Sequence, residues 1–319
     1  MMTVRTMRRV VDDVQAGRVP RVALAAAARW NGRDPVHVRS SANHVFRFLR
    51  NGQMLYLRLT PASERGRDAI LAELDFVLHA ARAGLGVAWP VPSAQGALVE
   101  DVDDHHAVAF AALGGGPREW DELDEPMFRA WGGALARLHG ASETFPVRTA
   151  LPDLRGEMRA ALETLPAHDA AVAALLESGL AWLDGLPADE YGLLHGDFEL
   201  DNLFWEAGRV HVLDFDAAAY GLYAMDVAIA LGDVWRDGGA DRDERLAWFF
   251  AGYAEVRPLP TGTGAMLPRL VRLSSALKVA RLLHAYATTD DTSSPGWVTA
   301  MRARHERWLR ARRAEFETS

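Results

Sequence analysis

The first third of the chain alternates between short apolar runs and polar residues. Three runs are rich in β-branched and aromatic residues, as strands are; they cover residues 35–40, 44–50 and 54–60. The last two alternate apolar with polar positions, and Asn51 and Gly52 between them favour a tight hairpin turn. This region therefore predicts an antiparallel sheet that begins with three strands.

The pattern then changes to a helical period. Apolar residues that include Ile70, Leu74 and Val77 recur three or four positions apart, which predicts one helix over residues 63–84. Two further strand patterns follow, over residues 97–100 and 106–113. Short helices are expected before the first strand.

Three glycines and a proline, Gly114 to Pro117, make the strongest break in the pattern. Beyond it, helical periodicity dominates over residues 125–142, 167–186, 243–256, 266–287 and 297–316. Only residues 191–216 show strand patterns again, as a hairpin-like unit. We therefore expect an α+β fold of two lobes, residues 1–113 and residues 114–319, joined by a hinge near residues 110–117.

Composition narrows the functional classes. The chain has 319 residues, 49% of them hydrophobic and 24% charged, as in ordinary globular proteins. Its 35 basic and 43 acidic residues give a net charge of −8, which argues against a nucleic-acid partner because phosphate contacts need clustered Lys and Arg. The absence of cysteine excludes disulfides, thiolate zinc sites and cysteine nucleophiles, and it is compatible with a cytoplasmic location.

No membrane partner is expected either. No uncharged apolar run approaches the ~20 residues that a spanning helix needs. Asp12 and Asp13 interrupt the segment in which a signal peptide would need its apolar core.

The candidate chemistry is concentrated in the stretch "LLHGDFELDNLFW", residues 193–205. Polar residues lie between two apolar anchors; they are His195, Asp197, Glu199, Asp201 and Asn202. The segment "VHVLDFD" follows, and it predicts a buried strand that ends at Asp214, with Asp216 two positions later. From the residues alone, this cluster could bind a metal, perform acid–base chemistry or form a polar turn.

The spacing within the cluster resembles the protein-kinase-like phosphotransferases. In that pattern an Asp is followed five positions later by an Asn, and then by a hairpin that ends in an Asp before Phe. The form "HGD" in place of "HRD", together with the downstream "MDVAIAL", is similar to the aminoglycoside phosphotransferase and choline kinase-like superfamily, near its homoserine kinase and spore-coat-associated branches. The resemblance covers about residues 36–287 and is strongest over residues 191–231.

The resemblance implies ATP and Mg²⁺ as cofactors and assigns roles to the cluster. Asp197 would orient the acceptor hydroxyl, and His195 would support the loop without reacting. Asn202 and Asp214 would hold the magnesium ion, for which oxygen ligands are suited. Asp216 is a further candidate for a metal or substrate contact, while Glu199 and Asp201 could line an acidic acceptor pocket.

The resemblance also assigns a nucleotide site to the first lobe. The third strand offers Arg58 where protein kinases carry Lys, and the helix offers Glu73 as its partner, in competition with Glu64 and Asp75. Backbone groups of Ala111 to Leu113 would bind the adenine.

The loop between the first two strands departs from the glycine-rich pattern of protein kinases. It reads "RSSANH" and contains no glycine. Ser40, Ser41 and Asn43 are the candidates for binding phosphate, and a plain polar turn is the alternative.

We therefore expect an ATP- and magnesium-dependent kinase. The acceptor would be a small molecule with a hydroxyl group, such as an aminoglycoside, an amino alcohol, a sugar or a homoserine-like compound. The alternatives are a protein Ser/Thr kinase of the same fold and a non-catalytic nucleotide-binding pseudokinase. Six aromatic residues could line an acceptor cleft or pack in a core; they are Trp235, Trp248, Trp297, Trp308, Tyr220 and Tyr223.

Overall fold

An antiparallel sheet forms the N-terminal part of the computed structural model, which describes residues 2–166, 169–186, 190–286 and 295–317. The strand order is β1-β2-β3-β7-β5, and β6 also pairs with β7. The bounds are β1 Arg33–Ser40, β2 His44–Arg50, β3 Gln53–Pro61, β5 Pro90–Val91, β6 Glu100–Val102 and β7 His105–Ala111. At the tip of the β2–β3 hairpin both Asn51 (φ 50°) and Gly52 (φ 82°) have positive φ, as the predicted turn requires.

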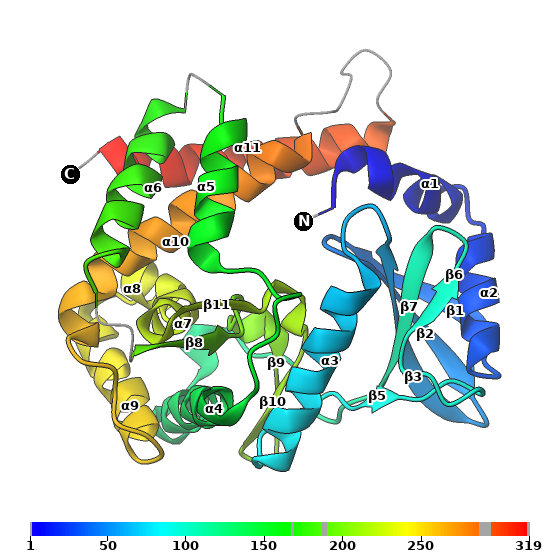
Figure 1. Ribbon diagram of the computed structural model, residues 1–319, viewed down its shortest axis with the longest axis horizontal. Helices are drawn as coiled ribbons and strands as arrows, with labels where there is room; N and C mark the ends of the chain where they lie inside the picture. The colour runs from blue at the N-terminus through cyan, green and yellow to red at the C-terminus, as the bar shows by residue number, and fades with distance from the viewer. Residues whose placement is uncertain (1, 167–168, 187–189, 287–294, 318–319) are drawn as a thin grey trace.

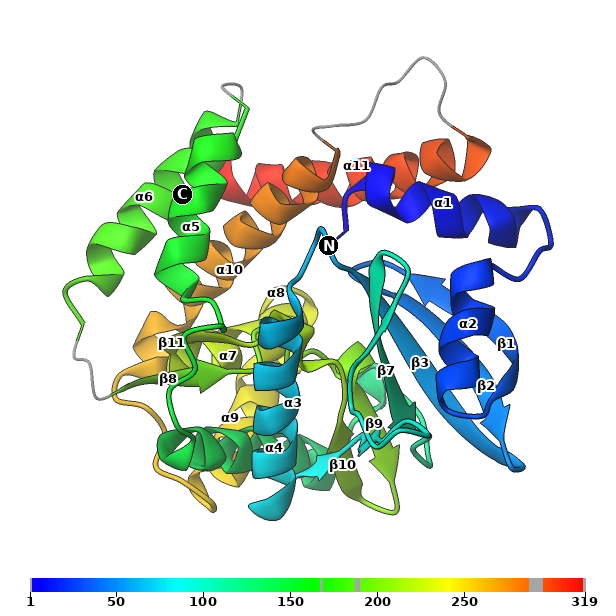
Figure 2. The same cartoon turned by 45° about the vertical axis from the view of Figure 1, so that its right-hand side comes forward.

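Helices lie on both sides of this sheet. α1 (Val4–Gln15) and α2 (Arg21–Arg29) lie on its outer side, and α3 (Arg67–Arg82) lies between the sheet and the helical part of the chain (Figures 1 and 2). α3 is apolar on two faces: Ile70 and Leu74 pack with Val108 of β7, whereas Phe76 and Val77 belong to the large helical core. This helix therefore ties the two parts of the molecule together.

The rest of the chain is mostly helical. Its helices are α4 Glu125–Thr144, α5 Leu154–Thr164, α6 Ala170–Leu183, α7 Tyr223–Ala230, α8 Gly232–Asp237, α9 Arg242–Ala254, α10 Thr263–Tyr286 and α11 Gly296–Glu317. The predicted α+β class is confirmed. Residues 167–168 and 287, at the edges of two predicted helical segments, lie outside the described residues.

Two small sheets position the polar cluster between the large sheet and the helices. β8 (Tyr191–Leu194) pairs with β11 (Ala219–Leu222), and β9 (Leu203–Glu206) pairs with β10 (Arg209–Val212). β10 also pairs in parallel with the short β4 (Gly86–Val87). The predicted strand–loop–strand unit is therefore present, but its last strand ends two residues before Asp214.

The glycine-rich break passes over β9. Trp205 and Gly116 exchange backbone hydrogen bonds, with Trp205 N–H donating to the Gly116 carbonyl at 2.9 Å. Gly115 has φ 73°, and a Cβ there would lie 1.9 Å from the carbonyl oxygen of Trp205. Only glycine fits this close approach, so Gly115 is required for the packing of this segment against β9.

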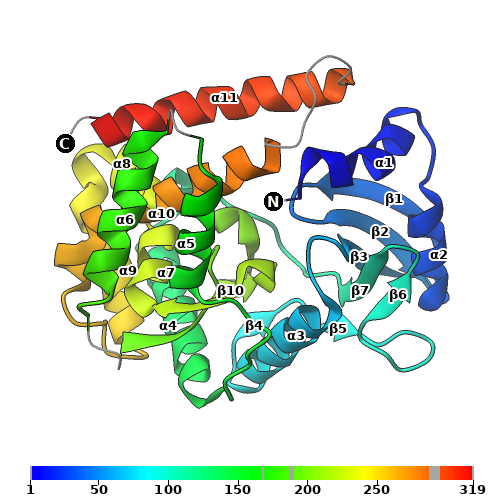
Figure 3. The same ribbon diagram turned by 45° about the horizontal axis from the view of Figure 1, so that its top comes forward.

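The C-terminal helix α11 spans the molecule. It runs from the region of α6 to α1 at the other end (Figure 3). There Trp297 and Met301 pack against Met2, Met7 and Val11 of the N-terminal segment, and the indole N–H of Trp297 donates to Asp12 at 2.8 Å. No helix in the described part of the chain is both long and apolar enough to cross a membrane.

Candidate active site

The loop after β8 is anchored by a buried carboxylate. The backbone N–H groups of His195 and Gly196 donate to the two oxygens of Asp226 at 2.7 and 2.8 Å. Asp226, on α7, is completely buried and also lies 3.3 Å from the Nε2 of His139. Gly196 has φ 77°, and a Cβ there would lie 2.1 Å from the carbonyl oxygen of Ala217. The sequence "HGD" is thus a tight turn whose first two backbone donors are satisfied by one aspartate.

His195 faces the inside of this loop. Its Nε2 donates to the carbonyl of Leu213 at 2.9 Å, and its Nδ1 accepts from the N–H of Asp197 at 3.3 Å. These two contacts require the neutral ring with its proton on Nε2. Because both ring nitrogens are used and the side chain is fully buried, His195 holds the loop in place.

Asp197 and Asn202 form a hydrogen-bonded pair. The Nδ2 of Asn202 donates at 2.9 Å to Oδ2 of Asp197 and at 2.9 Å to its backbone carbonyl. The other oxygen, Oδ1, lies 3.6 Å from Nζ of Lys278. Both ends of the Asp197 carboxylate are therefore fixed in orientation.

Lys278 is the only lysine of the chain, and sequence reasoning did not include it in the site. It extends from α10 and forms a salt bridge with Glu199 as well as its contact to Asp197. Burial disfavours the charged ammonium, but the carboxylates of Glu199 and Asp197 prevail and raise the pKa of Lys278. The residue therefore stays charged beside Asp197.

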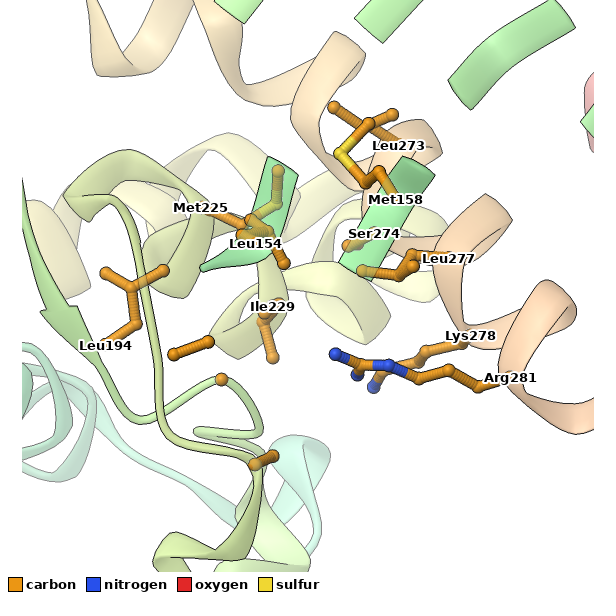
Figure 4. Close-up of a pocket in the computed structure, with 13 residues that line it drawn as sticks. Leu154, Met158, Leu194, Met225, Ile229, Leu273, Ser274, Leu277, Lys278 and Arg281 are labelled. Carbon is orange, nitrogen blue, oxygen red and sulfur yellow. The ribbon is translucent and has the colours of Figure 1, made fainter. Parts of the chain in front are cut away.

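Arg281 lies one helical turn after Lys278, and Figure 4 shows the two side chains extending side by side from α10 below an apolar group that includes Leu194 and Ile229. Arg281 forms a salt bridge with Glu157 of α5. Nothing in the sequence signals either contact, because the paired residues are 79 and 124 positions apart.

Asp214 lies next to Asn202 because of the β9–β10 hairpin. The N–H of Leu213 donates to the carbonyl of Asn202 at 2.9 Å, and Asp214 follows in a left-handed conformation with φ 58°. Burial, followed by the nearby carboxylate of Asp216, raises the pKa of Asp214 to about 7. A bound cation would therefore stabilise the charged form of the Asp214 carboxylate.

Two arginines approach Asp214. Arg39, at the end of β1, forms a salt bridge with its Oδ2. Nη1 of Arg58 on β3 lies 4.0 Å from its Oδ1.

The predicted pair of Arg58 and Glu73 is present and buried. The guanidinium donates to both carboxylate oxygens at 2.7 and 3.0 Å, and the two side chains are 5% and 1% exposed. Arg65 also donates to Glu73. The competing candidates are used elsewhere, since Glu64 accepts from Thr3 and Thr6 near the N-terminus and Asp75 pairs with Arg148.

The glycine-free loop between β1 and β2 turns most of its polar groups toward the protein. Oγ of Ser40 lies 2.9 Å from a ring nitrogen of His37 and 2.8 Å from one of His44. Asn43 donates to Asp216 at 2.6 Å and accepts from Thr60 at 2.7 Å. Of the three predicted phosphate ligands, Ser41 lines the cleft beside Asp197 and Asp214, whereas Asn43 lines a different cleft with Thr60 and Asp216.

A cavity of about 280 Å³, here called the sheet cavity, lies between the large sheet and the β9–β10 hairpin. Its apolar walls come from both sides; they include Val38, Val45 and Phe110 of the sheet, and Phe204 and Val212 of the hairpin. Arg39, Arg58 and Asp214 form its charged end, and Glu73 and Asp201 also belong to its lining. Phe110 lines the cavity, whereas the adjacent predicted residues Ala111 and Leu113 do not belong to its lining.

A second cavity of about 420 Å³, here called the loop cleft, lies on the other side of Asp214. Its charged lining comes from the polar cluster, from α10 and from the end of β1; it comprises Asp197, Asp201, Asp214, Asp216, Lys278, Arg281 and Arg39. His305 and Trp308 of α11 complete one wall. Arg39, Asp201 and Asp214 line both cavities, so the two meet at these residues. Asp216 thus joins the site, while Glu199 reaches it through Lys278.

Among the six aromatic candidates, Trp308 lines the loop cleft. The others serve packing. Trp235, Trp248 and Tyr220 lie against the helical core, Tyr223 is inside it, and Trp297 belongs to the cluster between α11 and α1.

Comparison with known proteins identifies the family. The model of the phosphotransferase enzyme family named APH matches residues 37–259, which is more than half of the chain. The chain belongs to the APH family. It is an ATP-dependent small-molecule kinase that transfers a phosphoryl group to a hydroxyl group, as the sequence predicted.

Curated proteins are similar to the chain over most of their length. The chain is 27% identical over 285 residues to the amicoumacin kinase of Bacillus subtilis (strain 168), covering 82% of this chain and 84% of that protein. It is 30% identical over 240 residues to a homoserine kinase of Mesorhizobium japonicum, covering 69% and 72%. The fold is that of a solved amicoumacin kinase in complex with AMP-PNP, Ca²⁺ and Ami (TM-score 0.79, 23% identity, 96% of this chain and 95% of that chain).

Proposed function

We propose that this APH-family enzyme binds ATP in the sheet cavity and phosphorylates a small molecule in the loop cleft. The adenine would lie between the apolar walls, with the phosphates toward Arg58 and Asp214. The observation that carries this proposal is the place where the cavities meet: Asp214 lines both, and the hydrogen-bonded Asp197 and Asn202 line the cleft beside it. A phosphoryl group transferred between the cavities passes this point.

The donor set at this point fits magnesium. Asp214 offers a carboxylate, and Asn202 offers its carbonyl oxygen, because its amide nitrogen is used by Asp197. Among the described residues, no cluster of three or more His, Asp or Glu could hold a metal by itself. That agrees with Mg²⁺, which binds through one or two protein oxygens together with substrate phosphates and water. When bound there, the ion would neutralise charge on the phosphates.

Asp197 is proposed to orient the acceptor and to take its proton. As the hydroxyl oxygen bonds to the γ-phosphorus and the bond to the β-phosphate oxygen breaks, the hydroxyl proton passes to the Asp197 carboxylate. Asn202 and Lys278 hold that carboxylate in orientation. Such positioning accounts for most of the catalysis in phosphoryl transfer.

The first lobe is proposed to hold the nucleotide through the predicted groups. Arg58, kept in place by Glu73, would pair with a phosphate, and backbone groups of Ala111 to Leu113 would bind the adenine edge. We place the division between the lobes after residue 113, with residues 110–117 as the hinge, and we propose a cytoplasmic location.

We propose that the acceptor is a small hydroxyl compound that carries an amine. Asp197, Asp201 and Asp216 give the loop cleft carboxylates that suit a cationic group. The relatives are named for an antibiotic and an amino acid. A protein acceptor is disfavoured because β11 and α7 follow directly after Asp216, leaving no long segment to bind a peptide.

The test uses purified protein, ATP and Mg²⁺ with a panel of homoserine, choline, aminoglycosides and a protein acceptor, followed by ³¹P NMR. We expect a phosphomonoester from at least one amine-bearing small molecule. Asp197→Asn should lower its rate by about a hundredfold or more, while Asp243→Asn, at an exposed position of α9, should leave it unchanged. Phosphorylation of the protein alone would refute the proposal.

A further inference from the structure

The loop between β1 and β2 contains no glycine, yet it lies where a nucleotide-binding loop is expected. The side chains of Ser40 and Asn43 are bonded within the protein. Ser41 reaches only the loop cleft. Arg39, immediately before the loop, is different: its side chain is 46% exposed and lines both cavities.

Arg39 also has an exchangeable partner. Its guanidinium pairs with Asp214, which is the residue proposed to bind magnesium. Arg58 is not free to change partner, because it is buried and both of its terminal nitrogens donate to Glu73. Any contact of Arg58 with a phosphate would add to that pair and would not replace it. A guanidinium keeps its charge under all physiological conditions. When the Asp214 carboxylate binds a metal, Arg39 therefore needs another anion.

The phosphates of a bound nucleotide are that anion. They would lie at the charged end of the sheet cavity, where Arg39, Arg58 and Asp214 meet. A planar guanidinium can donate two parallel hydrogen bonds to a phosphate, and such charge-assisted bonds are among the strongest in proteins. The long, half-exposed side chain of Arg39 can change partner without disturbing the core.

We propose that Arg39 binds the terminal phosphates of the nucleotide, in place of a glycine-rich loop. Its pair with Asp214 is the resting arrangement, which metal–nucleotide binding exchanges for a pair with phosphate. This inference rests on the proposed nucleotide site and adds a ligand that neither the family match nor the sequence pattern assigns.

The inference predicts a selective effect on binding. Removing Arg39 should weaken the binding of ATP and leave the binding of adenosine, which carries no phosphate, unchanged. Arg33→Met is the matched control, because Arg33 is an exposed arginine at the start of the same strand, lies 4.0 Å from Asp34 and does not line either cavity.

The experiment is isothermal titration of the full chain with ATP in Mg²⁺, and separately with adenosine. Arg39→Met should bind ATP about tenfold more weakly or worse and adenosine within about twofold of the wild type. Arg39→Lys should recover part of the ATP affinity, and Arg33→Met should match the wild type.

Three results would overturn the inference. Arg39→Met could bind ATP as tightly as the wild type, which would leave the proposed function standing. It could lose ATP and adenosine affinity equally, which would show that Arg39 does not act on phosphate. If the wild type itself failed to bind ATP, the proposed nucleotide site would be refuted, and the role of Arg39 with it.

Discussion

At the residue scale, the charges of the proposed site are arranged in pairs of opposite sign. Arg58 pairs with Glu73, Lys278 with Glu199 and Arg39 with Asp214. The pairs differ in exposure, from nearly complete burial of Arg58 and Glu73 to the half-exposed side chain of Arg39. Buried charges need their partners, because desolvation is costly. The buried pair therefore fixes structure, while the exposed pair can exchange.

Glu73→Gln tests the buried pair. The change removes the carboxylate that Arg58 and Arg65 share and leaves a buried guanidinium without its main partner. We expect the free energy of unfolding to fall by about 3 kcal/mol or more, measured by urea denaturation.

The control for this variant is Asp75→Asn on the same helix. Asp75 pairs with Arg148 at the surface, where the side chains are 54% and 43% exposed. Its loss should change the free energy of unfolding by less than about 1 kcal/mol. If both variants lowered the free energy of unfolding by the same amount, burial would not be what makes the pair of Arg58 and Glu73 stabilising.

The sequence predicted many individual residues of the candidate site, but few of the residues that contact them. Asp197, Asn202 and Asp214 follow from spacing along one short stretch. Lys278 and Arg39 do not, because each acts through a residue far away in the chain, and a single sequence carries no signal for such contacts. The pair of Arg58 and Glu73 is an exception, because here the predicted partner is also the observed one and both side chains are buried.

At the element scale, hairpins and one helix bring the site together. The β9–β10 hairpin places Asp214 beside Asn202, and α7 supplies the anchor Asp226 to the loop after β8. α10 then closes the other side with Lys278 and Arg281. This helix begins after residue 259, where the family match ends.

Lys278→Met tests the contribution of α10. Without its ammonium, the Asp197 carboxylate loses the partner of one oxygen, so we expect kcat to fall about tenfold with little change in ATP affinity. The rates are to be measured with an acceptor that the panel identifies.

Lys278→Arg, which keeps the charge, should recover part of the rate. Arg269→Met on the same helix is the control, because Arg269 donates to the carbonyl of Ser178 at 3.0 Å and does not line the loop cleft. An unchanged kcat for Lys278→Met would show that the contact of Lys278 with Asp197 does not contribute to catalysis.

The positions of elements with a strong hydrophobic periodicity could be predicted from the sequence. The positions of short elements without such a pattern could not. The alternating strands β2 and β3 and the long helices α3, α4 and α10 are present close to their predicted bounds. The strand over residues 97–100 begins three residues later than predicted, at Glu100. β4 and β5 have two residues each, too few for a pattern. β11 has the sequence "AYGL", whose β structure comes from pairing with β8.

At the scale of the whole molecule, the large sheet and the helical part lie on opposite sides of the sheet cavity. α3 packs both with β7 of the sheet and with the helical core, and α11 spans from the helical part to α1 (Figure 3). Because α11 also supplies His305 and Trp308 to the loop cleft, the acceptor would be bound between elements from both ends of the chain. Neither this span nor the meeting of the cavities could be predicted from periodicity.

The sheet contains a group that makes global stability depend on pH. Burial, followed by the charges of His105 and His37, lowers the pKa of His44 from 6.5 to about 3. Below pH 6.5 the unfolded chain binds a proton at this residue that the folded chain does not, so the contribution of His44 falls as the pH falls.

His44→Gln isolates this effect. The difference in unfolding free energy between wild type and variant should be constant above pH 7 and should shift against the wild type below pH 6.5, by about 1.4 kcal/mol per pH unit. Urea denaturation at several pH values measures it. A difference that stays constant down to pH 4.5 would show that His44 titrates normally in the folded protein.

The central claim is that Asp197 directs the γ-phosphoryl group of ATP to a hydroxyl of a small molecule. The most direct measurement incubates the enzyme with ATP, Mg²⁺ and a bacterial small-molecule extract, and follows by mass spectrometry which compounds gain a phosphoryl group. We predict at least one new phosphomonoester that forms with the wild type and not with Asp197→Asn. If no compound gained a phosphoryl group, or if both proteins formed the same product at the same rate, the claim would be contradicted.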